Sequence, residues 1–437
     1  MRIEDLHRLF IGCDQKVSTD TRNIMSGCIF FALKGENFNG NTFAGKALDS
    51  GADYAVVDEV EVVGTDSRMI LVHDVLSALQ DLASYHRQTL PTNLIGLTGS
   101  NGKTTSKELI HAVLSRKLNT LATIGNLNNH IGVPLTLLRL KAEHEVGVIE
   151  MGANHQGEIE TLARIADPDL GIITNIGKAH IGTMGGLQGI IKTKCELFDH
   201  LLGKNGTVFV PSSQAVLIER SGEMKRTTYG VLGHEDILGQ ADVDIEGRIR
   251  FKWKTSDSEF GLWVETALVG GYNIDNCLAA VAVGLHFGVS DADISSAISE
   301  YIPTNHRSQQ IHVGGVTYIM DAYNANPSSM AEALRSLAER KGRKGFILGE
   351  MLELGEFSDA EHAEILNQAI AMKPDLAVFV GEGFRELAIA TAGVCWAPDA
   401  SSAKAILEST DLKGMTVLVK GSRRNRLELV LDRHSEH

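Results

Sequence analysis

The sequence has few cysteines and no paired arrangement of them. Its five cysteines are scattered over 437 residues and include no C-x-x-C pair, which argues against a zinc cluster and against a disulfide framework. We therefore expect a protein of the reducing cytoplasm.

Positive charge is also in deficit, since the sequence has 41 Lys and Arg against 55 Asp and Glu, for a net charge of −14. This balance excludes a broad nucleic-acid or anionic-lipid surface, so an anionic ligand needs a local positive site.

Long apolar runs and repeats are missing as well. The longest apolar stretch, around Cys277 to Val289, is shorter than the roughly 20 residues of a membrane-spanning helix. Glu4 and Asp5 stand where a signal peptide would be apolar, so we expect neither export nor membrane insertion. At roughly 100 to 200 residues per domain, the length predicts about three domains.

Short apolar runs alternate with helical patterns along the chain, which is typical of α/β domains. Residues 1–90 form the first predicted domain, which ends before Pro91. Residues 91–303 repeat a strand, glycine turn and helix, and predict a doubly wound parallel sheet. Between 242 and 264 the period changes to two, which predicts antiparallel strands at the edge of that sheet. Residues 304–437 restart the rhythm and predict a Rossmann-like domain. The predicted strands are Cys28–Leu33, Tyr54–Val57, Met69–Val72, Leu94–Leu97, Val146–Ile149, Leu170–Ile173, Thr207–Val210, Val316–Met320, Phe346–Leu348, Leu376–Val380 and Met415–Val419.

A glycine loop connects a predicted strand with a predicted helix in the central domain. Strand Leu94–Leu97 precedes Gly99, Gly102 and Lys103. Such a loop turns backbone N–H groups toward phosphate oxygens at a helix N-terminus, the lysine adds a full charge, and the hydroxyl of Thr104 can ligate Mg²⁺. Leucine occupies the place of the first glycine in the strict G-x-x-x-x-G-K-[ST] pattern. The chain contains no Asn-Lys-x-Asp motif, which disfavours guanine as the base.

Segments along the whole chain resemble the Mur ligase family. The loop Thr98-Gly-Ser-Asn-Gly-Lys-Thr-Thr105 is similar to the shortened phosphate loop of these enzymes, which also lacks the first glycine. The stretches Gly-Ala-Asn-His-Gln-Gly-Glu-Ile and Tyr-Asn-Ala-Asn-Pro resemble the branch that adds D-alanyl-D-alanine, and the Asp-Asn-Pro-Arg motif of the branch that adds a diamino acid is absent. The further segments that carry the resemblance are Asn128–Leu138, Ile149–Ile159, Thr174–His180, Asp321–Met330, Leu348–Gly355 and Val419–Arg423.

The resemblance implies an ATP-dependent acid–D-amino-acid ligase of peptidoglycan precursor synthesis. The terminal carboxylate of UDP-N-acetylmuramoyl-tripeptide would attack the γ-phosphorus of ATP, giving an acyl phosphate and ADP. The amine of D-alanyl-D-alanine would then displace phosphate. The implied cofactors are ATP and two Mg²⁺ ions, the implied partners are the two substrates, and a monomer is expected. The protein would contribute mainly by positioning the reactants and neutralising anionic oxygens.

The family pattern implies four metal ligands, namely Thr104, Glu150, His180 and Lys194. Glu150 ends a predicted strand, where open α/β sheets place their ligands, although it could be a plain solvated glutamate. A lone histidine is more often structural, and nitrogen would be an unusual ligand for Mg²⁺. Lys194 would be carbamylated by CO₂, which replaces an ammonium with a carboxylate; Lys192 is the competing candidate. The residues implied as catalytic are Lys103, Glu150, His180 and Lys194.

Nucleotide contacts are implied in three parts of the chain. Asn276 would contact adenine, although Asn276 and Asn273 could simply cap the helix that follows. Arg307, at the hinge into the third domain, would reach the phosphates or ribose. Asp321 and Asn324 would close over ATP, and the alternative there is an Asx-Pro turn. The implied nucleotide-binding residues are Gly99, Ser100, Asn101, Gly102, Lys103, Thr104, Thr105, Asn276, Arg307, Asp321 and Asn324.

Substrate contacts are implied mainly in the first domain. Residues 18–22 and 30–40 resemble the family's uridine-diphosphate-binding stretches, in which glycines and hydroxyls permit close approach to the diphosphate. Asn129 and His130 would face the acyl-acceptor end of the nucleotide substrate. The implied substrate-binding residues are Thr21, Arg22, Lys34, Asn129 and His130.

Two other functions stay open. A folylpolyglutamate or cyanophycin-type synthetase would use the same ATP chemistry on another acid, but the uridine-type segments argue against it. A non-catalytic nucleotide-binding regulator descended from a ligase would be expected to have lost a site residue, whereas all the implied catalytic and metal-ligating residues are present. Lysine and diaminopimelate are both compatible with the third position of the tripeptide.

Overall fold

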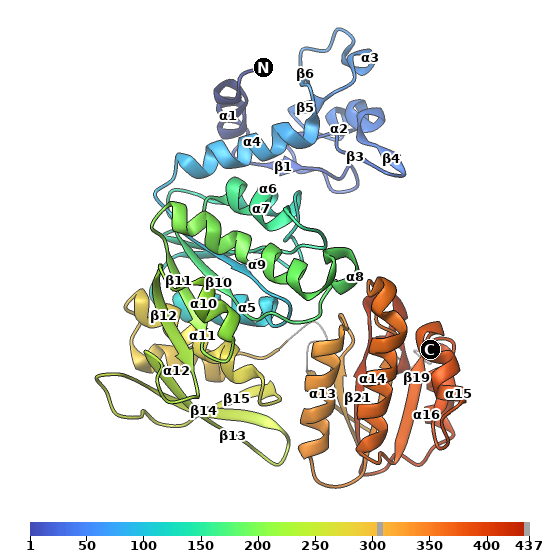
Figure 1. Cartoon of the computed structure of the whole chain (residues 1–437). Coiled ribbons are helices and arrows are strands. Elements are labelled where there is room, and N and C mark those ends of the chain that lie inside the picture. Colours follow the sequence, from blue (N-terminus) through green and yellow to red (C-terminus); the bar gives the residue numbers. More distant parts are fainter. Residues whose placement is uncertain (304–308, 432–437) are drawn as a thin grey trace.

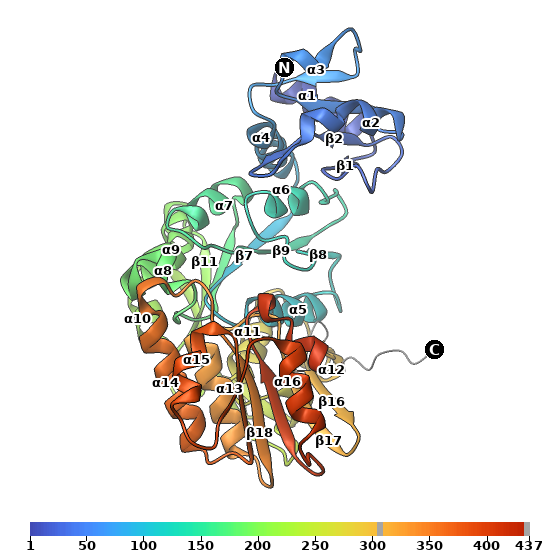
Figure 2. The ribbon, with the colours of Figure 1, turned by 90° about the vertical axis from the view of Figure 1, so that its right-hand side faces the viewer.

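Three large sheets follow one another along the sequence and organise the chain into three domains, the first of which also contains a small two-stranded sheet (Figure 1). The structure is a computed structural model and describes residues 1–303 and 309–431. In two views at right angles, the central domain lies between the first domain and the third (Figures 1 and 2). The predicted α/β class is therefore confirmed, with mostly parallel strands in each of the three sheets.

The first domain has a parallel four-stranded sheet in the order β1-β2-β5-β6. All three residues of β2 are buried, which explains the apolar run that predicts this strand. Asp74 caps the long helix α4 by accepting a hydrogen bond from the backbone N–H of Ser77 (2.7 Å). The elements are α1 (Ile3–Gly12), β1 (Val17–Ser18), β2 (Ile29–Phe31), the antiparallel pair β3 (Lys34–Gly35) and β4 (Phe38–Asn39), α2 (Ala44–Asp49), β5 (Tyr54–Val57), α3 (Val60–Val63), β6 (Met69–Leu71) and α4 (Val75–Gln88).

The central domain is built on a nine-stranded sheet in the order β15-β14-β13-β12-β11-β10-β7-β9-β8. Helices α5, α11 and α12 pack on one face, and α7 and α9 pack on the other. The strands are β7 (Asn93–Thr98), β8 (Thr120–Ala122), β9 (Val146–Glu150), β10 (Leu170–Ile173), β11 (Thr207–Pro211), β12 (Lys225–Gly230), β13 (Ile237–Val243), β14 (Arg248–Thr255) and β15 (Val264–Val269). The helices are α5 (Lys103–Leu114), α6 (Gly132–Leu137), α7 (Glu158–Ala166), α8 (Ile181–Met184), α9 (Gly186–Gly203), α10 (Ala215–Arg220), α11 (Asn273–His286) and α12 (Asp291–Glu300).

The antiparallel strands predicted between 242 and 264 are present at one edge of this sheet. Ile249, Phe251 and Trp253 of β14 point into the core, as the period of two requires. The alternation does not continue through Ile245, which is 94% exposed, because residues 244–247 form the turn between β13 and β14. Gly247 makes that turn possible with a φ of +75°.

The third domain has a six-stranded sheet in the order β16-β17-β21-β18-β19-β20, in which only the β16–β17 pair is antiparallel. Asn326 and Ser329 cap α13 reciprocally, with Pro327 in the first turn, so the Asn-Pro stretch is a helix start and the Asx-Pro turn interpretation is wrong. The elements are β16 (Gln309–Val313), β17 (Val316–Asp321), α13 (Pro327–Glu339), β18 (Lys344–Gly349), α14 (Ser358–Ala371), β19 (Leu376–Val380), α15 (Arg385–Ile389), β20 (Cys395–Ala397), α16 (Ala400–Glu408) and β21 (Thr416–Lys420), with short 3₁₀ turns between them.

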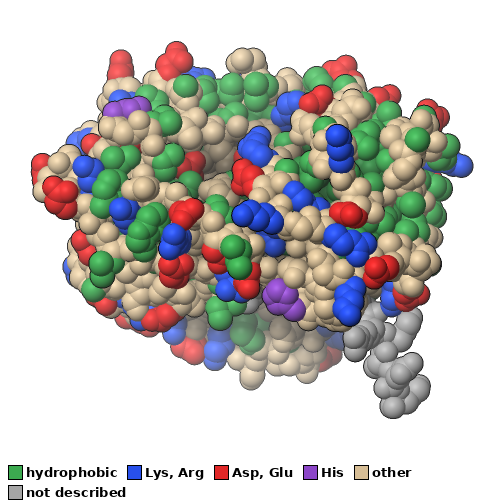
Figure 3. All heavy atoms as spheres, turned by 90° about the horizontal axis from the view of Figure 1, so that it is seen from below, with side chains coloured by type: hydrophobic (Ala, Val, Ile, Leu, Met, Phe, Trp, Pro, Cys, Tyr) green, Lys and Arg blue, Asp and Glu red, His purple; other side chains and the backbone are tan. Residues whose placement is uncertain are grey.

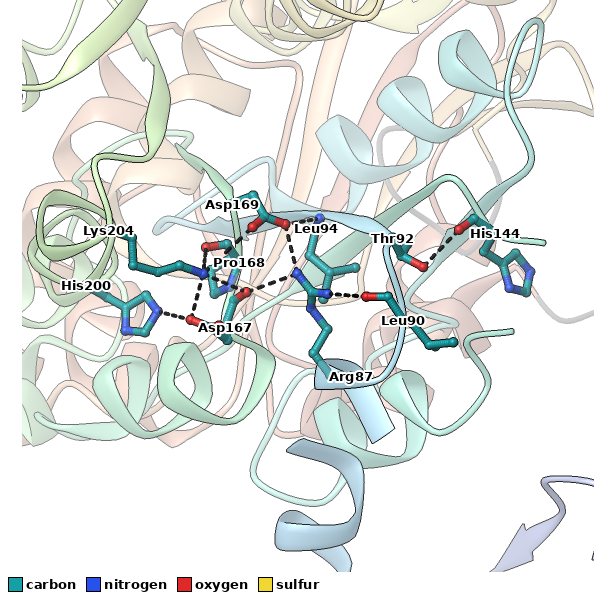
Figure 4. A network of polar contacts seen from close by, with 10 residues as sticks. All are labelled: Arg87, Leu90, Thr92, Leu94, His144, Asp167, Pro168, Asp169, His200 and Lys204. Carbon is teal, nitrogen blue, oxygen red and sulfur yellow. Dashed lines mark hydrogen bonds and ion pairs between the residues drawn. The ribbon is translucent and has the colours of Figure 1, made fainter. Parts of the chain in front are cut away.

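A buried arginine fastens the first domain to the central one (Figure 4). Arg87, at the end of α4, donates through Nη2 to Asp169 Oδ2 (2.8 Å). The same carboxylate oxygen accepts the backbone N–H of Leu94 at the start of β7 (2.9 Å). Nearby, Asp167 Oδ1 accepts a hydrogen bond from Nζ of Lys204, the C-cap of α9 (2.7 Å). The connection between α4 and β7 is thereby fixed to two further segments of the central domain.

The surface agrees with the mixed charge of the sequence. On the face seen in Figure 3, Lys and Arg side chains are interspersed with Asp, Glu and hydrophobic ones. In the part of the chain that the structure describes, no helix is both long and apolar enough to cross a bilayer.

Candidate active site

A cleft of about 860 Å³ lies where the carboxyl ends of the central strands face those of the third domain. The central domain contributes residues 100–105 and Glu150, and the third domain contributes Asp321 and Lys420. The cleft has the size of a small-molecule or cofactor site and lies at the strand ends where open α/β sheets bind ligands.

The predicted glycine loop forms one wall of the cleft and leads into α5. Gly102 is the N-cap of α5 with a φ of +76°, and Gly99 has a φ of +142°. A Cβ atom at Gly99 would lie 2.0 Å from the hydroxyl of Thr174, so only glycine fits there. Lys103 folds back, and its Nζ donates to the carbonyls of Gly99 (2.7 Å) and Ser100 (3.2 Å). An ammonium and a helix N-terminus therefore lie together in front of the cleft.

Ser100 and Asn101 hold the glycine loop in place through hydrogen bonds to the segment that follows β10. The Ser100 hydroxyl donates to the carbonyl of Gly177 (2.9 Å) and accepts its N–H (2.8 Å). The backbone N–H of Asn101 donates to Asn175 Oδ1 (3.0 Å). Both residues line the cleft, but their hydrogen bonds hold the loop against the segment that follows β10.

Thr104 and Glu150 meet at the floor of the cleft. Thr104 Oγ1 donates to Glu150 Oε2 (3.0 Å), and Asn128 Nδ2 donates to Glu150 Oε1 (2.9 Å). Glu150 is 2% exposed, so the interpretation as a plain solvated glutamate is wrong. Its carboxylate beside a hydroxyl is the kind of oxygen donor set that Mg²⁺ prefers. Asn128 is not among the site residues predicted from the sequence, although it begins one of the segments that carry the family resemblance.

Lys194 is buried in α9 and is 1% exposed, whereas Lys192 is exposed. Burial and, to a smaller extent, the charge of Lys103 together lower the pKa of Lys194 to about 7, against the opposing pull of Glu158 and Glu196. Lys103 and Glu158 both line the cleft. The structure thus places Lys194 within electrostatic reach of the phosphate loop.

His180 lies in the cleft wall at the start of α8, and its Nδ1 contacts the carboxylate of Glu353 from the third domain. This contact lowers the pKa of Glu353. Among residues 1–303 and 309–431, no three His, Cys, Asp or Glu side chains gather around a common metal position. A metal beside Thr104 and Glu150 would therefore need further oxygens, such as those of nucleotide phosphates.

Asn276 supports the phosphate loop from α11. Its Oδ1 accepts the hydroxyl of Ser106 (2.9 Å) and its Nδ2 donates to Asn273 Oδ1 (2.8 Å). Neither asparagine caps α11, because Tyr272 is the N-cap and Asn273 Nδ2 donates to the carbonyl of Val269. The helix-cap interpretation is therefore wrong.

The third domain brings an acid–base pair and one hydrogen bond to the cleft. Asp321 pairs with Lys420, whose side chain is 3% exposed. Asn326 Nδ2 donates across the domain interface to Asn101 Oδ1 (2.8 Å). Lys420 was missed from the sequence, although the Val419–Arg423 segment contains it.

The remaining predicted residues divide between the cleft and the first domain. Arg22 pairs with Asp20 (2.6 Å) and holds the pKa of that carboxyl down to about 2, and Lys34 pairs with Asp58 (2.8 Å) and Glu59 (3.1 Å). With Thr21, these basic residues lie outside the cleft lining, and Arg307 lies outside the described residues. The predicted residues that line the cleft are Ser100, Asn101, Gly102, Lys103, Thr104, Thr105, Asn129, His130, Glu150, His180, Asn276, Asp321 and Asn324.

In a comparison with known protein families, a different family model matches each of the three domains. The model of the Mur ligase family catalytic domain matches residues 15–87, that of the Mur ligase middle domain matches 97–284, and that of the Mur ligase glutamate ligase domain matches 306–423. The chain belongs to the Mur ligase family, and the resemblance seen in the sequence is confirmed.

Within the family, the chain is similar to the enzymes that add D-alanyl-D-alanine. The UDP-N-acetylmuramoyl-tripeptide–D-alanyl-D-alanine ligase of Bacillus subtilis is 38% identical over 352 residues, which cover 80% of this chain and 76% of the relative. A crystal structure of MurF from Acinetobacter baumannii superposes with a TM-score of 0.87 at 32% identity, covering 95% of this chain and 92% of that one. MurF of Thermotoga maritima in complex with ADP gives a TM-score of 0.85 at 27% identity, covering 96% of each chain.

Proposed function

We propose that this chain joins D-alanyl-D-alanine to UDP-N-acetylmuramoyl-tripeptide and converts ATP to ADP and phosphate. The observation that carries the proposal is the cleft, in which the phosphate loop and Glu150 of one domain face Asp321 and Lys420 of another. The relatives named for this reaction match nearly the whole chain in sequence and structure. Hydrolysis by water is the competing outcome, and a two-domain cleft that can close favours group transfer.

ATP would bind with its phosphates on the loop 99–105. The T. maritima relative was solved with ADP, and the loop here has the same elements that bind phosphate elsewhere, namely inward N–H groups, a helix N-terminus and Lys103. Lys103 Nζ, which now binds carbonyls of its own loop, would turn to the β- and γ-phosphates. Asn276, Asp321 and Asn324 would contact the adenosine, and Arg307 would add a charge at the hinge.

The reaction follows from the order in which bonds can form. A carboxylate oxygen of the tripeptide attacks the γ-phosphorus, the bond to the β-phosphate oxygen breaks, and ADP leaves. The neutral amine of D-alanyl-D-alanine then attacks the acyl carbon, phosphate departs with the attacking oxygen, and the nitrogen loses a proton. Lys103 and the N-terminus of α5 neutralise the phosphoryl oxygens throughout.

The donor atoms fit magnesium at one position. Thr104 and Glu150 would hold an ion, whose charge would offset that of the phosphates. A second ion beside the acyl phosphate would use Glu150, as the family resemblance implies, together with His180 and a carbamylated Lys194. The pKa of about 7 supports this modification, because CO₂ reacts with the neutral amine, releasing one proton as the carbamate forms.

We further propose that the chain divides into domains at 1–90, 91–303 and 304–437. The first domain would bind the uridine diphosphate of the substrate through Thr21, Arg22 and Lys34. Asn129 and His130 of the central domain would lie near the peptide end of the same substrate. The enzyme would act as a monomer in the cytoplasm. Arg22 and Lys34 each form an ion pair with an acidic side chain. Binding of the diphosphate would therefore replace these carboxylates as the partners of the two basic side chains.

Phosphate release from ATP tests the proposed function. We expect release with UDP-N-acetylmuramoyl-tripeptide to depend on D-alanyl-D-alanine, and D-glutamate or L-lysine to be ineffective as acceptors. Lys103→Ala should reduce turnover by about 100-fold or more while the melting temperature stays unchanged, because the charge on the phosphates is lost and no core packing is removed. Turnover with a folate or an aspartate polymer in place of the tripeptide would contradict the assignment.

A further inference from the structure

We propose that Glu353 is a positioning residue, which reaches from the third domain into the cleft and fixes the imidazole of His180 when the two domains meet. The inference rests on the proposed function and deepens it, because it assigns a role to the domain interface in completing the site. Glu353 lies in Leu348–Gly355, one of the segments that carry the family resemblance, but it is not among the catalytic, metal-ligating, nucleotide-binding or substrate-binding residues that the resemblance implies.

Glu353 uses both its side chain and its backbone at this contact. Its Oε2 contacts His180 Nδ1, and its carbonyl accepts the backbone N–H of Gly182 (3.2 Å). The two residues are 173 positions apart in the sequence and lie in different domains. The side chain of His180 is 19% exposed, so the imidazole is largely enclosed when it meets the carboxylate.

Both residues of the pair hold an unusual backbone conformation. His180 has a φ of +57° and Glu353 has a φ of +62°. Left-handed backbone is unfavourable for residues other than glycine and persists where the surroundings determine it, often at functional sites. Because two such residues contact each other across the domain interface, we infer that the backbone on both sides is held in the conformation that this contact requires.

A glycine on each side lets the two backbones touch. A Cβ atom at Gly182 would lie 2.6 Å from the backbone nitrogen of Gly355, and one at Gly355 would lie 3.2 Å from the Cα of Gly182. Gly355 also has a φ of +55°. Helix α8, which begins after His180, and the turn after Glu353 can therefore approach more closely than segments with side chains at these two positions could.

The contact with Glu353 can determine which imidazole nitrogen of His180 is available to bind a ligand in the cleft. A carboxylate beside Nδ1 would favour the tautomer that carries its proton there and would leave Nε2 as the acceptor nitrogen, as in other carboxylate–histidine pairs that orient metal-binding imidazoles. Because the carboxylate comes from the third domain, His180 gains this orientation only when that domain lies against the central one. Domain closure and readiness of the site would then be coupled.

A neighbouring ion pair supplies the control. Lys178 Nζ pairs with Glu361 (2.6 Å) across the same interface, and its backbone N–H donates to Ser328 Oγ (2.9 Å). This pair holds the domains together without touching His180. Glu361→Gln should therefore weaken the domain interface without affecting His180. Glu353→Gln instead removes the negative charge beside the imidazole, while the side chain keeps nearly the same size.

The test compares the two variants in steady-state kinetics and in Mn²⁺ binding, followed by electron paramagnetic resonance with a non-hydrolysable ATP analogue and the tripeptide substrate. For Glu353→Gln we expect kcat to fall about 10- to 100-fold with KM for ATP little changed, and the weaker of two Mn²⁺ affinities to fall by a similar factor. Glu353→Asp should recover part of both losses. Glu361→Gln should keep kcat and Mn²⁺ affinity near wild type.

A double variant separates positioning from a merely structural role. In a His180→Ala background, Glu353→Gln should cause no further loss, because Glu353 acts through His180. Additive losses, equal behaviour of Glu353→Gln and Glu361→Gln, or wild-type Mn²⁺ binding in Glu353→Gln would each overturn the proposal. Failure of the proposed function is seen separately, as a wild-type enzyme that binds Mn²⁺ but does not turn over the tripeptide.

Discussion

Lys194 shows how burial changes the chemistry of one side chain. In water a lysine of pKa about 10.4 has roughly one neutral amine in a few thousand at pH 7. With a pKa of about 7, roughly half of the Lys194 amines are neutral at that pH. The neutral amine is the nucleophile that CO₂ requires, so the burial of Lys194 supports the proposed carbamylation at this position.

Removal of the two lysines should have opposite consequences. Lys194→Ala should lose activity by about 100-fold or more, because an anionic ligand supplied by the carbamate is lost. Added acetate should restore part of it by supplying a carboxylate. Lys192→Ala should behave nearly like wild type in the same phosphate-release assay. A fully active Lys194→Ala enzyme, or a severe loss confined to Lys192→Ala, would contradict the assignment.

Carbamylation should also give the activity a characteristic pH dependence. The pKa of Lys194 is lowered, so the neutral amine predominates above about pH 7 and falls about tenfold for each pH unit below it. In CO₂-depleted buffer, activity should therefore decline more steeply from pH 8 to pH 6 than in bicarbonate at constant ionic strength. Acetate-rescued Lys194→Ala is the control and should show no bicarbonate effect. A bicarbonate response that is the same at both pH values would count against the modification.

At the scale of elements, the turn between β7 and α5 determines where phosphate can bind. Its glycines are needed for backbone geometry as well as for access, since Gly99 packs directly against Thr174 after β10. The hydroxyl of Thr174 in turn donates to the carbonyl of Asn101 (2.6 Å). The loop is therefore held in shape by the neighbouring strand before any nucleotide arrives.

A methyl group at Gly99 should disrupt this loop. Gly99→Ala places a Cβ 2.0 Å from the Thr174 hydroxyl at a positive φ, which we expect to cost about 1–3 kcal/mol of stability and to weaken ATP binding about tenfold or more. Calorimetry gives both quantities. The control is Gly12→Ala at the end of α1, where a Cβ meets no atom within 4 Å. Equal nucleotide affinity in Gly99→Ala and wild type would show that the loop tolerates the change.

Most of the parallel strands that the sequence predicts are buried on both faces. Every residue of β9 and β19 is buried, and such uninterrupted apolar runs are visible without a structure. Strand β12, Lys225–Gly230, is largely polar and was not predicted, because it is a strand through its pairing with β11 and β13. The three-residue β8 was too short to show a period.

The same distinction holds for the site. The phosphate-loop residues are consecutive, so a sequence motif places them together. The pairs Asp321–Lys420 and His180–Glu353 join segments that are about 100 or more positions apart, and no local pattern records such a contact. Only the fold brings these partners together.

Across the whole molecule, the two domain joints differ in kind. The joint between the first and central domains is a short connection held by the buried Arg87. The third domain instead meets the central one through contacts from several separate segments, including Asn326 to Asn101 and Glu361 of α14 to Lys178. We expect the third domain to be the one that moves, closing when ATP and the tripeptide substrate are both bound.

Loss of the arginine should loosen the first joint. In Arg87→Ala, Asp169 keeps its bond from the N–H of Leu94 but loses the guanidinium, so we expect a loss of about 1–3 kcal/mol. The first calorimetric transition should fall by several degrees, and KM for the UDP substrate should rise with kcat little changed. Arg8→Ala, which removes an exposed surface pair with Asp5, should change both quantities far less. Equal effects of the two variants would show that Arg87 has no special role at the joint.

The fate of one oxygen atom tests the central claim, which is that this molecule activates the tripeptide carboxylate by phosphorylation. UDP-N-acetylmuramoyl-tripeptide labelled with ¹⁸O in its terminal carboxylate is incubated with the enzyme, ATP and D-alanyl-D-alanine, and the released phosphate is analysed by mass spectrometry. Because the attacking oxygen departs with phosphate, we expect one ¹⁸O in each released phosphate and the joined pentapeptide as the other product. Unlabelled phosphate, with or without ligation, would contradict it.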